Sequence, residues 1–260
     1  MSASGGSGPL RVLFAGESWI KHTIHMKGFD QFHSTEYEEG AGDFLAALDR
    51  EGFDVTYVRG HEISSRFPRS ARQLDDFDVV VLSDIGSNSF LLPDETFLRS
   101  ERSTNRLALL RDWTRAGGGL VMIGGYMSFT GFEGKARFGM TPLADVLPVR
   151  MLDHDDRIED PEGVKADFDE PAHAVLGGTP RRVAAAVGVQ PCDRQARRDD
   201  RGPCRGRPPP AGGRVGRRGP LRRVHVGPGT PLGAAGVRRV AALPETVASI
   251  LGWAAGSRPP

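Results

Sequence analysis

From Gly117 to Phe129 the chain reads GGGLVMIGGYMSF. The glycine triplet is a typical helix stop, and the apolar run Leu120–Ile123 is typical of a short buried strand. The run ends at Gly124 and Gly125, which permit a tight turn because glycine adopts positive φ without steric cost. In α/β sheets, ligands bind in the crevice outside the carboxyl ends of the strands. The turn at Gly125 is therefore the predicted centre of a site.

Three further apolar runs precede this strand, at residues 10–16, 53–58 and 78–84. The run 78–84 is continuous rather than alternating, which suits a strand covered on both faces. Helical spacing of apolar residues predicts a helix over 42–51, stopped by Gly52, and a second helix from its cap at Ser103 to Arg115. Repeated strand–helix units of about 30–40 residues predict an α/β fold with a doubly wound parallel sheet and right-handed crossovers.

The connecting segments carry weaker patterns. Glu17 to Glu39 is predicted to be a polar loop, and residues 70–74 a short helix. After the turn at Gly125, residues 142–147 are expected to form a short helix and residues 149–152 a strand. Residues 153–170 are acidic, and we interpret them as a solvated loop in preference to a metal site.

Composition sets limits on the class of protein. A length of 260 residues is enough for a sizeable core, and a formal net charge of +1 argues against a nucleic-acid or membrane-surface binder. Two cysteines give no disulfide framework, and no apolar run approaches the ~20 residues that span a bilayer. The start of the chain lacks the pattern of a secretory signal. A cytoplasmic protein is expected.

Between Arg181 and Val247 the composition changes abruptly. Arginine, proline and glycine are dense, Lys, Phe, Tyr, Trp, Ile and Met are absent, and Cys192 and Cys204 both fall here. One interpretation is a basic disordered tail that binds nucleic acid. We favour another, a GC-rich coding sequence read out of frame, because permitted codons for residues 220–232 shifted by one base read RSVAFTSDLAPHW. On this hypothesis the last strands of the sheet are disrupted.

The predicted organisation has four parts. They are a disordered tail at 1–8, an α/β domain at 9–180, the Arg/Pro/Gly segment at 181–247, and the remnant of a C-terminal helix with a tail at 248–260.

Four strings in the first two thirds of the chain resemble one family. They are VLFAGESW from Val12, HTIHMKGFD from His22, VLSDIGSN from Val81 and GGLVMIGG from Gly118. They are similar to bacterial proteins of the class I glutamine amidotransferase-like family, and the resemblance covers residues 9–180. It implies a flavodoxin-like α/β sandwich.

The chain departs from this family type at the nucleophile. Class I amidotransferases place a cysteine thiolate on the strand-to-helix elbow and activate it with a histidine. Here the elbow from Ile123 to Ser128 reads IGGYMS and contains no cysteine. Glutamine hydrolysis by the usual route is therefore not expected. Whether the protein is an enzyme stays open, and no catalytic residue is assigned, since nothing in the sequence supplies a base for Ser128.

Polar residues just past the predicted strand ends are the candidate ligand-binding set. They are Glu17, Ser18, His22 and His25 after the first strand, Asp84, Ser87 and Asn88 after the third, and Gly124, Gly125 and Tyr126 at the turn. Each type also has a purely structural use, because Asp, Asn and Ser cap helices and turns and Gly permits tight packing.

We expect the crevice to hold a small polar ligand, with no cofactor and no metal. The histidine pair, three residues apart, is a weak metal spacing. A non-enzymatic binding or assembly module is the alternative, and a homo-oligomer is left open. A basic-tailed nucleic-acid binder is a third hypothesis, tied to residues 181–247 being genuinely encoded.

Overall fold

The computed structural model describes residues 8–164, 186–189, 193–194, 223–226 and 243–256. At the centre of the fold is a five-stranded sheet with strand order β11-β6-β5-β1-β4. All its described pairings are parallel. Its strands are β1 (Arg11–Gly16), β4 (Asp54–Val58), β5 (Val79–Ser83), β6 (Gly119–Ile123) and β11 (Arg223–Val226). The predicted parallel α/β sheet is confirmed.

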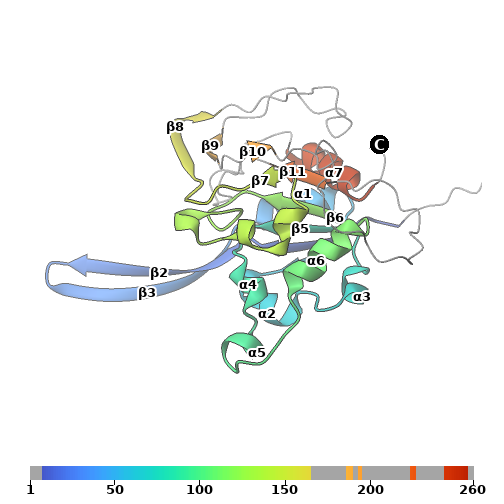
Figure 1. The fold of residues 1–260 in the computed structure, drawn as a ribbon. Helices are drawn as coiled ribbons and strands as arrows, with labels where there is room; N and C mark the ends of the chain where they lie inside the picture. Colours follow the sequence, from blue (N-terminus) through green and yellow to red (C-terminus); the bar gives the residue numbers. More distant parts are fainter. Residues whose placement is uncertain (1–7, 165–185, 190–192, 195–222, 227–242, 257–260) are drawn as a thin grey trace, which may run out of the picture.

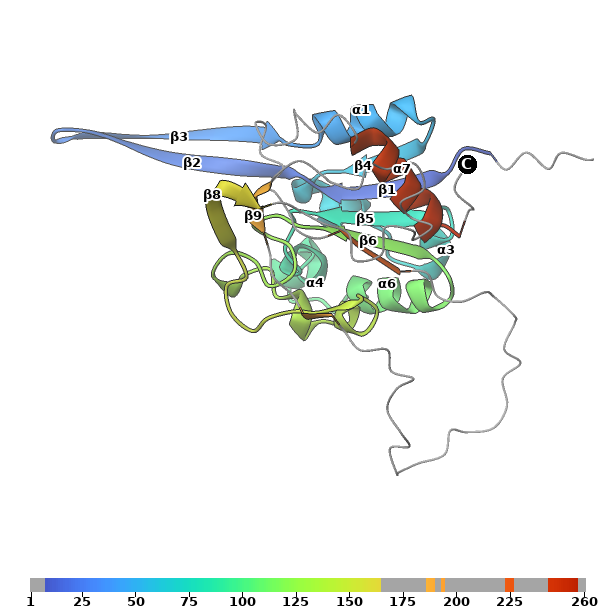
Figure 2. The same cartoon turned by 90° about the horizontal axis from the view of Figure 1, so that it is seen from above.

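Helices cover both faces of this sheet (Figures 1 and 2). One face carries α1 (Gly42–Arg50) and α7 (Leu243–Ala254). The other carries α2 (Ile63–Arg66), α3 (Ala71–Leu74), α4 (Asn88–Leu91) and α6 (Arg106–Arg115), and α5 (Asp94–Phe97) lies beyond α2 and α4.

Alternation along the strands explains the two layers. Val79 and Val81 of β5 belong to the core under α1 and α7, with Phe44 and Leu251. Val80 and Leu82 belong to the larger core on the opposite face, under α2, α3, α4 and α6. Successive side chains of a strand point to opposite faces, so a continuous apolar run is needed when both faces are covered.

Short elements fill the connections. The 3₁₀ turns are η1 (Gly60–Glu62), η2 (Phe132–Gly134), η3 (Phe138–Met140) and η4 (Pro142–Asp145). The small antiparallel strands are β7 (Val149–Arg150), β8 (Ile158–Val164), β9 (Ala186–Val189) and β10 (Asp193–Arg194), paired as β7 with β10 and β8 with β9.

The predicted polar loop from Glu17 to Glu39 is wrong. This stretch forms a two-stranded antiparallel ribbon of β2 (Ser18–Lys27) and β3 (Asp30–Glu39), which projects far from the sheet (Figure 1). The strands are joined by Gly28 and Phe29, and Gly28 has a φ of 65°. A two-residue loop with glycine first is typical of a hairpin. Polar side chains such as Lys21, His22 and His25 lie on both faces of the ribbon, so the sequence shows no clear alternation of apolar and polar residues.

Smaller differences concern element boundaries. The second long helix begins at Arg106, and its cap is Asn105, whose side chain accepts from the backbone N–H of Leu107 and Ala108. Ser103 is therefore not the cap. Part of the predicted acidic loop 153–170 is strand β8. The predicted helix at 70–74 is confirmed as α3, with Ser70 accepting from Gln73 N–H.

Most of the predicted tail 1–8 and of the segment 181–247, including Cys192 and Cys204, lies outside the described residues. The out-of-frame hypothesis stays a prediction. In the described residues no helix combines the length and the apolar character needed to cross a bilayer.

Candidate functional site

Two acidic residues stand at the carboxyl ends of the neighbouring central strands β1 and β5. Glu17 follows β1 with a φ of 48°, and Asp84 follows β5 with a φ of 42°. Positive φ is uncommon for residues other than glycine and marks a constrained turn. The backbone N–H of Glu17 donates to the carbonyl of Ser83 at 3.0 Å, so the two strand ends turn together.

The turn at Glu17 is held tightly by its neighbours. Gly16 has a φ of 113°, and a Cβ at this position would lie 1.8 Å from the carbonyl oxygen of Ser83. The hydroxyl of Tyr57 donates to the carbonyl of Gly16 at 3.0 Å, and the carbonyl of Glu17 accepts from Gly40 N–H at 2.8 Å. The sequence places Glu17 at the strand end, and these contacts fix its direction.

The Glu17 side chain is completely buried. Its Oε1 accepts from the hydroxyl of Ser83 at 2.5 Å. Its Oε2 is buried and has no hydrogen-bond partner among the described residues. Burial raises the pKa of Glu17 to about 8, and the nearby charge of Asp84 acts in the same direction. Glu17 is therefore mostly protonated and uncharged at neutral pH.

Asp84 connects this carboxyl to the predicted turn. Its Oδ1 accepts from the backbone N–H of Met127 at 2.7 Å. A Cβ on Gly125 would lie 2.7 Å from the Cβ of Asp84, so only glycine allows this approach. Burial raises the pKa of Asp84, against the effect of the bond from Met127. Gly125 therefore lies beside the end of β5, as the sequence predicts.

Ser128 serves the architecture of the turn. Its hydroxyl donates to the carbonyl of Ile123 at 2.7 Å and accepts from the backbone N–H of Asp84 at 3.1 Å. The residue is only 2% exposed. Both bonds involve the Ser128 hydroxyl oxygen, which would have to be released from them before it could act as a nucleophile.

Tyr126 lies at the surface edge of the turn, with 43% of the residue exposed. The guanidinium carbon of Arg157 lies 5.4 Å from the centroid of the Tyr126 ring and 4.0 Å from that of Phe132. The turn that binds Asp84 through Met127 N–H therefore carries an aromatic surface with a cation over it.

Asp155 and Asp156, in the acidic loop, hold the segment that follows the turn. Asp156 is buried and accepts from the backbone N–H groups of Thr130 and Gly131 at 2.9 and 2.8 Å. Asp155 accepts from Glu133 N–H at 2.8 Å and pairs with Arg157, and the Arg157 bond holds the pKa of Asp155 well below its usual range. These carboxylates bind backbone and guanidinium groups. Across the part of the chain that is described, no group of three or more His, Cys, Asp or Glu side chains could hold a metal.

Four other predicted residues lie near the strand ends in different roles. The Ser18 hydroxyl accepts from Gly60 N–H at 2.7 Å, which fixes the base of the ribbon. Ser87 and Gly124 are buried, and Asn88 is exposed at the first position of α4. Of the four, Asn88 is the one at an exposed position, and the ligand-binding role of the others stays a prediction.

His22 and His25 do not join the other candidates. Both are exposed on β2, along the projecting ribbon. His22 Nδ1 lies 3.0 Å from the Thr35 hydroxyl, and the His25 ring stacks on Phe32 with centroids 4.5 Å apart. The prediction that they line the crevice is wrong, because the segment extends as strand and carries them away from the sheet.

Sequence reasoning missed Ser83 and Tyr57, which hold Glu17 in place. Ser83 is the last residue of β5, and its position next to Asp84 was the available signal. Tyr57 could not be found, because its bond to the turn depends on the pairing of β1 with β4.

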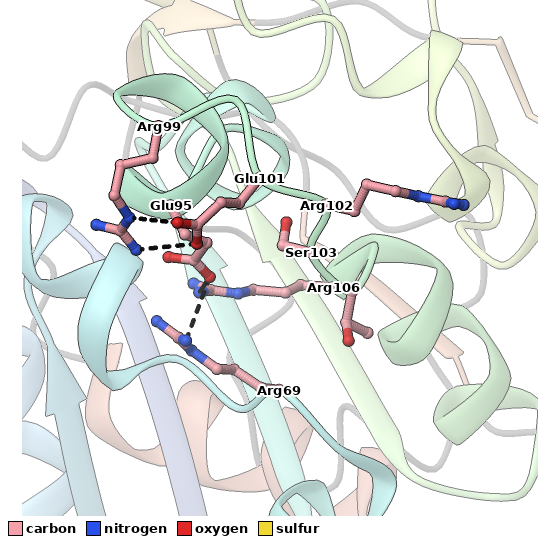
Figure 3. Close-up of a pocket in the computed structure, with 8 residues that line it drawn as sticks. Arg69, Glu95, Arg99, Glu101, Arg102, Ser103 and Arg106 are labelled. Atoms are coloured by element: carbon pink, nitrogen blue, oxygen red, sulfur yellow. Dashed lines mark hydrogen bonds and ion pairs between the residues drawn. The ribbon is translucent and has the colours of Figure 1, made fainter.

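A cavity of about 530 Å³ lies away from these residues, between α5 and the start of α6 (Figure 3). It is lined by Arg69, Glu95, Arg99, Glu101, Arg102, Ser103, Thr104 and Arg106. The Arg106 side chain is 1% exposed and donates to the carbonyls of Ile63 and Ser64. Glu95 Oε1 lies 3.2 Å from Arg69 Nη1 and 3.9 Å from Arg106 Nη2. The deepest guanidinium is thus used to join α6 to α2.

We expect Arg106→Ala to lower the free energy of unfolding by about 2–4 kcal/mol, because it removes a buried side chain and its hydrogen bonds to the carbonyls of Ile63 and Ser64. Arg102→Ala, at an exposed position of the same cavity, should change stability by less than about 0.5 kcal/mol. Urea denaturation of both variants measures the difference. Equal effects would show that the buried contacts of Arg106 contribute little.

The family model and the solved structures both match the larger part of the chain. Residues 11–200 match the family described as "Putative glutamine amidotransferase". Cytoplasmic protein STM3548 from Salmonella typhimurium is 46% identical with a TM-score of 0.69, over 72% of this chain and 75% of that one. Cytoplasmic protein STM1381 from Salmonella typhimurium LT2 is 45% identical with a TM-score of 0.68, over 72% and 76%. A search of curated proteins found no match.

Proposed function

This chain belongs to the family described as "Putative glutamine amidotransferase", and on that premise we propose that it binds a small polar ligand at the carboxyl ends of β1 and β5, without the thiolate chemistry of glutamine hydrolysis. The observation that carries the proposal is the buried Oε2 of Glu17, a strong hydrogen-bonding atom with no partner among the described residues. Leaving such an atom unpaired costs free energy, and a ligand recovers it.

The chemistry of the two carboxyl groups favours a neutral ligand with both donors and acceptors. A protonated Glu17 can donate or accept a hydrogen bond, as buried carboxylic acids in other sites do. Asp84, only partly buried, stands between Glu17 and the turn that carries Tyr126. Amides, hydroxyls and sugars match this set of groups. The aromatic edge of Tyr126 and Phe132 adds an apolar surface for the ligand body.

Hydrolysis of glutamine through a thiolate requires a cysteine at the elbow, and this elbow has none. We therefore assign binding, and no covalent step. A cytoplasmic location, as described for the two Salmonella proteins, is part of the same proposal.

A thermal-shift screen with glutamine, other primary amides and sugars tests the proposal. At least one of these ligands should raise Tm, and Asp84→Asn should weaken its binding by about tenfold or more, because an amide replaces an acceptor with a donor at the site entrance. Asp43→Asn, on the exposed first turn of α1, is the matched control and should bind as the unaltered protein does.

Three outcomes would contradict the proposal. The first is a screen in which none of the three ligand classes shifts Tm. The second is Asp84→Asn binding with unchanged affinity. The third is release of ammonia from glutamine that disappears in a Cys192→Ser, Cys204→Ser variant, which would restore thiolate catalysis.

A further inference from the structure

The ribbon of β2 and β3, residues 18–39, has two chemically different faces. Directly opposed residues share a face, as Ile20 does with Tyr37 and Lys21 with Glu36. One face, called the apolar face below, carries Ile20, His22, Ile24, Met26, Gln31, His33, Thr35 and Tyr37. The other face carries Trp19, Lys21, Thr23, His25, Lys27, Asp30, Phe32, Ser34, Glu36 and Glu38.

The second face carries the charged side chains of the ribbon between Trp19 and Glu38. Lys21 Nζ lies 2.5 Å from Glu38 Oε1 and 3.8 Å from Glu36 Oε2, and the Trp19 indole donates to Glu38 at 3.0 Å. Lys21, Glu36 and Glu38 are thus paired with one another within the ribbon. The apolar face has no such pairs and carries no Lys, Arg, Asp or Glu from Ile20 to Met26 or from Gln31 to Tyr37.

The ribbon exposes apolar side chains to an unusual extent. Relative exposure is 59% for Ile24, 72% for Met26 and 109% for Phe29 at the tip. Six of the eleven exposed large hydrophobic residues in the described part of the chain belong to the ribbon, the others here being Ile20, Phe32 and Tyr37. An isolated two-stranded ribbon is marginally stable in water, and a concentrated apolar patch marks an interaction surface.

We propose that the ribbon is a dimerisation arm, whose apolar face packs against the same face of a second copy of this chain. The charge pattern supports this occupant, because an uncharged face meets its own copy without repulsion and requires no partner of opposite charge. The spacing of the apolar residues permits such a dimer. With two ribbons antiparallel about a two-fold axis between His22 and Ile24, Ile20 of each copy lies opposite Met26 of the other.

The available area fits a weak, transient dimer. Ten residues per strand give a ribbon about 33 Å long and about 10 Å wide, so face-to-face packing covers on the order of 300–400 Å² per copy. A standard interface buries about 800 Å² per partner. The tip residue Phe29 then lies over the base of the other ribbon and adds contact there. We expect dissociation in the micromolar range.

Sedimentation velocity on the full-length protein, from about 1 to 100 µM, tests the proposal. The unaltered protein should sediment as a dimer at the upper concentrations. Ile24→Lys should weaken dimerisation by at least about a hundredfold, because it places two like charges near the two-fold axis. Thr23→Lys adds the same charge one residue away on the opposite face and should dimerise as the unaltered protein does.

Circular dichroism and Tm in dilute solution establish that both variants keep the sheet folded. A protein that stays monomeric at about 100 µM would overturn the proposal, and so would equal loss of dimer in Thr23→Lys and Ile24→Lys. Monomers that instead bind vesicles of anionic phospholipid through Phe29 would also overturn it, by assigning the ribbon to a lipid surface.

Discussion

Gly16→Ala is expected to destabilise the fold by at least about 4 kcal/mol. A methyl group there would lie 1.8 Å from the carbonyl oxygen of Ser83, and the φ of 113° is itself unfavourable for alanine. Neither strand can move away, because β1 and β5 are paired along their length and buried on both faces. Urea denaturation, or the absence of a folded far-UV spectrum, measures the effect.

Gly52→Ala separates the steric contribution from the backbone contribution. Gly52 has a φ of 74°, yet a Cβ there meets nothing within 4 Å. Its substitution should cost only about 1 kcal/mol. If the two variants lose equal stability, the close approach of β1 and β5 at Gly16 is not what constrains the site.

Glu17→Gln is expected to remove the part of the stability loss at alkaline pH that comes from ionisation of Glu17. Burial raises the pKa of Glu17 from 4.5 to about 8, so its folded form prefers the proton. Its contribution to stability is fully present below pH 4.5 and is lost as the pH rises through about 8. The loss is on the order of 4 kcal/mol, while the glutamine amide stays neutral and its oxygen still accepts from Ser83.

The measurement is the free energy of unfolding of both proteins at about pH 5 and pH 9. As the pH rises, the free energy of unfolding of Glu17→Gln should increase relative to that of the unaltered protein. Glu51→Gln, exposed at the end of α1, should leave the pH dependence unchanged. Parallel curves for the unaltered protein and Glu17→Gln would mean that folding does not perturb Glu17.

The sheet could be predicted because its strands are marked by short, continuous stretches of the sequence. Strands covered on both faces need unbroken apolar runs, and Val79–Leu82 or Leu120–Ile123 carry them in the sequence itself. The same reasoning placed Gly125 beside Asp84, since parallel strands end at one edge.

The ribbon and the state of Glu17 could not be predicted in this way. Lys21, His22, His25 and Lys27 are spread over both faces of Ser18–Lys27, so the stretch resembles a solvated loop, and only pairing with Asp30–Glu39 shows the strand. His22 and His25 were misplaced for that reason. A glutamate is ordinarily exposed, and the burial of Glu17 comes from the closure of Tyr57, Ser83 and Gly40 around it.

The titration of the Glu17 carboxyl carbon is the most direct test of a neutral, buried carboxyl at the ends of β1 and β5. It is followed by ¹³C NMR from about pH 4 to pH 10, with the resonance assigned by its absence in Glu17→Gln. A midpoint near 8 is expected from the burial of the side chain and the charge of Asp84. A midpoint at the ordinary 4.5 would contradict the proposed site.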